Sequence, residues 1–129
     1  MKLLAIPALL AGVAQAIQFL NDIPVGAYYD PGTEFVLEWK PEDRTDTFQL
    51  TITSFLTDPI LVNPGQSQFP VYDFKEMDIV LDEAVKFSEG SFTWLVEPID
   101  GRTGGDYYYS FRVAYETTTE SPRAFHLQE

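Results

Sequence analysis

Three groups of side chains in this sequence could do chemistry, and each would make a different kind of site. The chain of 129 residues has 20 Asp and Glu, one histidine (His126) and seven tyrosines. Paired carboxylates can hydrolyse a glycosidic bond when they flank it inside a cleft that raises one pKa. Nothing in the spacing of the acids selects such a pair, and most of them fall on outward strand positions or in loops. We therefore expect a non-enzymatic protein with no catalytic residues.

His126 is the one candidate for an imidazole base or an imidazole metal ligand. A serine triad would need a nucleophile beside it, and the sequence has no G-x-S-x-G elbow. The sequence has no cysteine, which excludes disulfides, thiolate metal sites and cysteine nucleophiles. The spacing of a calcium-binding EF-hand loop is also missing. We therefore expect no metal site and no cofactor.

The tyrosines form the remaining candidate site. Tyr28 and Tyr29 precede a turn, and residues 107–109 are three tyrosines at the start of a long strand pattern. Successive side chains of a strand point to opposite faces, so Tyr108 should point away from its two neighbours. Exposed rings could stack on the apolar faces of sugars, which makes Tyr28, Tyr29 and Tyr108 the candidate binding residues. The alternative is that these tyrosines are structural, with hydroxyls bonded to nearby backbone.

Residues 1–16 have the features of a secretory signal peptide. Lys2 supplies a positive charge, residues 3–14 are apolar or small, and residues 14–16 (AQA) fit the pattern that signal peptidase accepts. An apolar stretch of this length would span about 18 Å, too short for a membrane anchor. We expect cleavage before Ile17, no membrane insertion afterwards, and a secreted protein with a single domain, residues 17–129.

Alternation with a period of two predicts an all-β chain. The expected strands are residues 17–20, 35–39, 48–52, 59–62, 92–96, 107–115 and 124–127, with turn residues between them. Residues 72–85 fit either a strand or a helical face, and the β-branched residues favour the strand. Seven or eight short strands in about 110 residues predict an antiparallel β-sandwich.

The same alternation predicts which side chains the sandwich buries. Trp39, Phe92, Trp94 and Phe111 lie on the apolar faces and should form the core between the sheets. Arg112 falls on the opposite face from Phe111. We expect it to be solvated or to pair with an acid of a neighbouring strand.

Four motifs, in order after the signal peptide, resemble one family. They are residues 26–39 (GAYYDPGTEFVLEW), 90–96 (GSFTWLV), 105–113 (GDYYYSFRV) and 121–127 (SPRAFHL). Together they resemble the N-terminal Ig-like domain of the fungal cell-wall synthesis Kre/Knh family, which also occurs in secreted Ser/Thr-rich GPI-anchored fungal proteins. The resemblance implies an immunoglobulin- or fibronectin-like sandwich, association with the cell wall and a link to β-glucan assembly. It implies no catalytic residues.

The net charge of the chain limits the classes of partner that we expect. Eight Lys and Arg against 20 acids give a formal net charge of −12 at pH 7. Nucleic acid and anionic membrane surfaces require clustered basic residues, so we expect neither as a partner. A neutral wall polysaccharide such as β-glucan is the expected ligand, while cationic chitosan would bind through charge alone. The alternative is a secreted, effector-like module that binds a protein partner.

Overall fold

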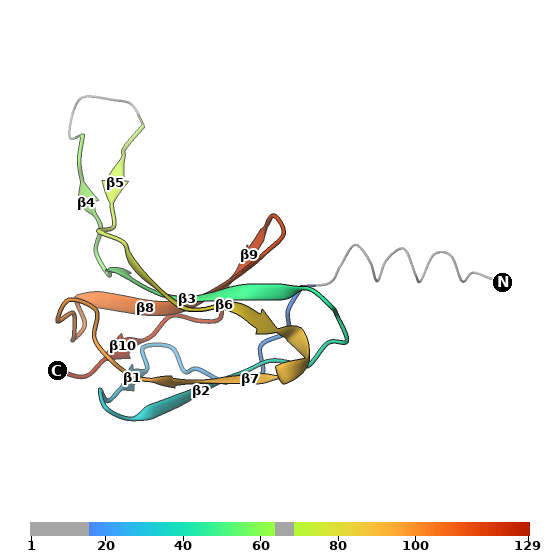
Figure 1. Cartoon of the computed structure of the whole chain (residues 1–129). Helices are drawn as coiled ribbons and strands as arrows, with labels where there is room; N and C mark the ends of the chain where they lie inside the picture. The colour runs from blue at the N-terminus through green and yellow to red at the C-terminus, as the bar shows by residue number, and fades with distance from the viewer. Residues whose placement is uncertain (1–15, 64–68) are drawn as a thin grey trace.

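The computed structural model describes residues 16–63 and 69–129, which form an antiparallel β-sandwich (Figure 1). The predicted fold class is confirmed, although ten strands replace the expected seven or eight because five of the ten have only two or three residues. The strands are β1 (Tyr28–Tyr29), β2 (Glu34–Glu38), β3 (Thr47–Leu56), β4 (Ile60–Leu61), β5 (Tyr72–Asp73), β6 (Met77–Lys86), β7 (Ser91–Leu95), β8 (Tyr107–Tyr115), β9 (Thr118–Glu120) and β10 (His126–Leu127). A single 3₁₀ turn, η1 (Phe87–Glu89), joins β6 to β7.

Two layers enclose the core, as the side view in Figure 1 shows. One layer is the four-stranded antiparallel sheet β6-β3-β8-β9, and the other is the antiparallel pair β2-β7. The short strands β1 and β10 pair in parallel at one end of the sandwich. A bridge between Tyr109 and Phe125 ties this pair to β8.

Alternation along the strands places the apolar side chains between the layers. In β3 and β8 the register pairs Leu50 with Val113 and Ile52 with Phe111, and these four side chains are at most 1% exposed. Both β3 and β8 are central strands of this sheet, because each is hydrogen-bonded to a neighbour on both edges.

Three of the four large aromatic residues predicted for the core are buried. Trp39 and Phe111 are fully buried, and Trp94 is 6% exposed with its ring edge-on to Phe111 at 5.4 Å. Phe92 is half-buried and packs against the core from its margin. The Trp39 indole donates its Nε1 hydrogen to the Phe87 carbonyl oxygen at 3.0 Å, so its polar atom is satisfied inside the core.

The ambiguous stretch 72–85 is strand except for residues 74–76, as the β-branched residues indicated. It supplies β5 and most of β6, and β6 runs antiparallel to β3 with a register shift near Leu50. As an edge strand, β6 leaves Ile79 and Val80 about half exposed. This exposure explains why its alternation reads less clearly than that of β3 or β8.

The remaining local predictions have mixed outcomes. The turn at residues 30–32 is present, with Gly32 at φ +88°, a conformation that glycine adopts without strain. The strand expected at residues 17–20 is reduced to one bridge between Phe19 and Trp39. Residues 1–15 of the expected signal peptide lie outside the described residues. Residues 64 and 65 of the turn expected after the strand at 59–62 also lie outside them.

Arg112 pairs with acids, as one of the two expectations had it, but these acids lie at the start of β6, which β3 separates from β8. Its guanidinium lies 3.2 Å from a Glu76 carboxylate oxygen and 3.5 Å from one of Asp78, which belongs to β6. The three side chains lie on the outer side of the sheet, where such pairs stabilise a protein by up to about 1 kcal/mol.

Candidate functional site

The structure brings two of the three candidate tyrosines together. Tyr28 of β1 lies directly opposite His126 of β10 in the parallel pair, and Tyr108 comes from β8. The His126 ring is stacked between them, with ring centroids 4.8 Å from Tyr28 and 4.2 Å from Tyr108. The three rings thus form one stack, which we call the Tyr–His–Tyr stack.

A hydrogen bond to the backbone fixes the histidine at the centre of this stack. His126 is only 6% exposed, and its Nδ1 lies 2.7 Å from the Tyr107 carbonyl oxygen. A carbonyl oxygen can only accept, so Nδ1 donates the hydrogen of this bond. The imidazole therefore acts as a rigid spacer between two phenol rings.

Tyr28 offers more open surface than Tyr108. Tyr28 is 44% exposed, whereas Tyr108 is half-buried and also contacts Phe55, with centroids 5.7 Å apart. A Cβ atom at Gly105 would lie 2.9 Å from the Tyr28 hydroxyl oxygen, so the glycine-rich loop packs closely against that ring. Tyr28 is thus held on its inner side by His126 and at its hydroxyl by the loop.

Tyr29 does not share this surface. Its ring packs edge-on against Phe35 at 5.1 Å and Phe125 at 5.3 Å, at the margin of the core. Burial, and then the negative charge of Asp22, raise the pKa of its phenol. The two tyrosines of β1 alternate in direction, and the position of Tyr29 is that of a structural residue.

Tyr109, which was not a candidate binding residue, has the structural role in which a tyrosine hydroxyl bonds to nearby backbone. The Tyr109 hydroxyl donates to the Arg102 carbonyl oxygen at 2.7 Å and accepts the Ile99 N–H at 2.8 Å. Tyr109 is fully buried, and these bonds tie β8 to the loop before it, as a tyrosine corner does. Burial raises the pKa of this phenol as well.

Acceptor groups are available around the Tyr–His–Tyr stack. Asp30, Asp106 and Glu129 are exposed residues in segments next to β1, β8 and β10 respectively. The loop that carries Asp106 is fixed, because Thr57 donates its N–H to the Asp106 carbonyl oxygen at 2.9 Å. Exposed carboxylates beside an exposed ring can accept hydrogen bonds from the hydroxyls of a sugar stacked on that ring.

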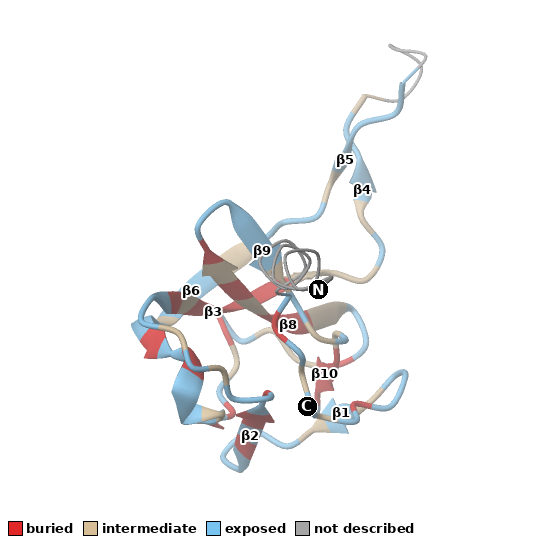
Figure 2. Ribbon diagram, turned by 90° about the vertical axis from the view of Figure 1, so that its right-hand side faces the viewer, coloured by how far each residue is buried: buried red, intermediate tan, exposed pale blue. Residues whose placement is uncertain are grey.

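A second surface was not identified from the sequence. The hairpin formed by β4, β5 and their flanking residues projects away from the sandwich (Figure 1) and is pale blue along most of its length in Figure 2. Its exposed apolar side chains are Ile60, Leu61, Val62, Phe69, Val71, Tyr72 and Phe74. These are seven of the 14 large hydrophobic side chains that are exposed among the described residues, so the hairpin is the most apolar part of that surface.

Comparison with known proteins adds no further assignment: no protein-family model matches this chain, and a search of curated proteins finds no match. Within residues 16–63 and 69–129, no three His, Asp or Glu side chains are grouped so that they could hold a metal ion. None of the helices in the same residues is both long enough and apolar enough to cross a bilayer.

Proposed function

We propose that this protein is a secreted, non-enzymatic, cell-wall-associated fungal protein that binds neutral β-glucan through the surface around Tyr28. The wall association comes from the resemblance of its four motifs to the Kre/Knh domain. The choice of surface rests on one observation, the Tyr–His–Tyr stack, which holds a 44% exposed ring between a buried histidine and a close-packed loop.

A ring that is already immobilised suits carbohydrate binding. Binding costs free energy when a mobile side chain must be ordered, and Tyr28 has little freedom left to lose. Its aromatic face is apolar, and the exposed carboxylates beside it accept hydrogen bonds, which matches the two kinds of surface on a sugar ring. The net charge of −12 is compatible with a neutral polymer and would oppose an acidic one.

The test is sedimentation of the secreted protein with insoluble β-1,3-glucan, β-1,6-linked glucan, chitin and chitosan, at low and at high salt. We expect retention on a glucan that survives high salt, and a loss of at least about tenfold in affinity for Tyr28→Ala, equivalent to about 1.4 kcal/mol. Tyr72→Ala is the matched control, because Tyr72 is similarly exposed, at 49%, but lies on the hairpin. Retention on chitosan alone that is lost in salt would indicate charge only and contradict the proposal.

The hairpin favours a second candidate function, the binding of a protein partner. An exposed apolar patch of this kind is typical of interaction surfaces. At the hairpin root Asp73 pairs with Lys75 and Glu76 pairs with Arg112, so a complementary partner would be recognised mainly by an apolar groove. If no polysaccharide retains the protein, this function becomes the preferred one. If Tyr72→Ala abolishes retention while Tyr28→Ala does not, binding occurs at the hairpin instead of the Tyr–His–Tyr stack.

A further inference from the structure

The backbone nitrogen of Ile17 lies in an unusual place for the first residue of a secreted domain. It donates to Oε2 of Glu120 at 3.1 Å, although 103 positions separate the two residues. The Ile17 side chain is 5% exposed and belongs to the hydrophobic core, whereas Ala16 before it is exposed. The chain therefore passes from the surface into the core at the peptide bond that the signal-peptide pattern marks for cleavage.

Glu120 receives hydrogen bonds but no cation among the described residues. It lies on β9, which pairs with the end of β8, and the same Oε2 also accepts the Tyr115 hydroxyl. No Lys or Arg within residues 16–63 and 69–129 comes within ion-pair distance of it. A partly buried carboxylate bound to two neutral donors would gain free energy from a positive charge beside it.

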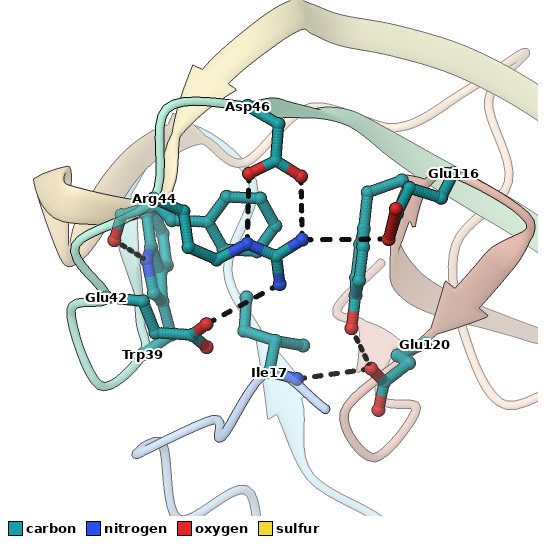
Figure 3. A network of polar contacts seen from close by, with 9 residues as sticks. Ile17, Trp39, Glu42, Arg44, Asp46, Glu116 and Glu120 are labelled. Carbon is teal, nitrogen blue, oxygen red and sulfur yellow. Dashed lines mark hydrogen bonds and ion pairs between the residues drawn. The ribbon is translucent and has the colours of Figure 1, made fainter. Parts of the chain in front are cut away.

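The charged groups near Glu120 carry more negative than positive charge. Arg44 is the central cation of the network in Figure 3, and its guanidinium lies 4.2 Å from the centre of the Phe87 ring. The carboxylates of Glu42, Asp46 and Glu116 surround it at 2.6–3.7 Å. Three carboxylates thus share one guanidinium, and no ion pair is left for the Glu120 carboxylate.

We propose that cleavage between Ala16 and Ile17 creates an α-ammonium group that forms a partly buried ion pair with Glu120, so that processing itself stabilises the folded protein. The proposal rests on the predicted signal peptide and is independent of the ligand. A secretory peptidase adds water across the peptide bond, which leaves a carboxylate on Ala16 and an amine on Ile17 that takes up a proton at neutral pH. The nitrogen keeps its position and changes from a neutral donor into a cation.

This ion pair would make stability depend on pH in a defined direction. A free α-amino group has a pKa near 7.7–8.0, and a carboxylate partner raises it. A raised pKa gives stabilisation that is complete below about pH 7.7 and is lost as the pH rises through the folded value. Besides Glu120, the titratable neighbours are Tyr115 and Arg44. Burial and Glu120 raise the pKa of Tyr115 to about 12, and the hydrogen bond to Asp46 raises the pKa of Arg44, so neither group titrates in this window.

Three N-terminal forms of the protein test the proposal: one starting at Ile17, one retaining Ala16, and one starting at an acetylated Ile17. We expect the Ile17 form to have a Tm about 5 °C above the other two at pH 7, and this difference to disappear near pH 10. Glu120→Gln should remove the difference. Glu116→Gln is the matched control and should preserve it, because Glu116 contacts only the Arg44 end of the network at 3.7 Å.

Three results would overturn the proposal. The first is an intact mass of the secreted protein that places its first residue anywhere other than Ile17. The second is an equal Tm of the three forms at pH 7, which remains decisive even if Glu120→Gln fails to fold. A difference in Tm that persists in Glu120→Gln would also count against it, because the ammonium would then act through another group.

Discussion

At the scale of single residues, the aromatic side chains differ mainly in what their polar atoms contact. The hydroxyl of Tyr109 and the indole N–H of Trp39 are bonded to backbone inside the core. Tyr28 instead places its ring against His126 and leaves 44% of its surface exposed. Residues of one chemical type therefore serve as structural anchors or as candidate binding groups according to their position.

Tyr109→Phe should destabilise the protein by about 2 kcal/mol. The substitution keeps the ring but removes the acceptor of the Ile99 N–H and the donor to the Arg102 carbonyl oxygen, and Ile99 is itself 5% exposed. Urea unfolding gives the change in the free energy of unfolding. Tyr107→Phe, on the half-buried neighbour, is the control and should change it by less than about 0.5 kcal/mol. Equal losses in the two variants would show that the Tyr109 bonds contribute little.

At the scale of secondary-structure elements, alternation predicted where the strands lie in the sequence better than it predicted which strands pair. Residues 107–115 were expected as one strand and form β8 with those bounds, because all but one of the five inward side chains are buried. The strands β1 and β10 have two residues each, and about 100 positions of sequence separate them, so no local pattern indicates that they pair. The meeting of Tyr28 with His126 depends on this pairing and could not be predicted.

The hairpin was missed for a related reason. An apolar residue in a short strand gives the same sequence pattern whether or not a second layer covers it. Residues 59–62 were correctly expected to include a strand, but in the fold β4 pairs only with β5 and projects from the sandwich. Its apolar side chains therefore remain exposed.

Matched valine substitutions should separate the hairpin from the core. Val71→Ala, on the hairpin, should change the free energy of unfolding by less than about 0.5 kcal/mol, because Val71 is 53% exposed. Val113→Ala removes the same atoms from a fully buried position of β8 and should cost about 2 kcal/mol. Urea unfolding measures both. A loss at Val71 as large as that at Val113 would mean that the hairpin stabilises the fold and is not merely an exposed extension.

At the scale of the whole molecule, most acids of the described residues have no side-chain ion-pair partner. Among the described residues, Arg44, Lys75 and Arg112 make all the side-chain ion pairs, with six of the 20 acids. The other acids repel one another in the compact state and gain distance on unfolding. Screening should therefore favour the folded protein.

We expect the Tm to rise by several degrees between about 0.05 M and 0.5 M NaCl, because the Debye length falls below the separation of most surface carboxylates. Calorimetry at pH 7 measures this rise. The same series near pH 4 is the control: many carboxylates are then protonated, so the rise should be smaller. A Tm that falls with salt at pH 7 would mean that the networks around Arg44 and Arg112 outweigh the repulsion. Equal rises at both pH values would point instead to salt-strengthened apolar burial.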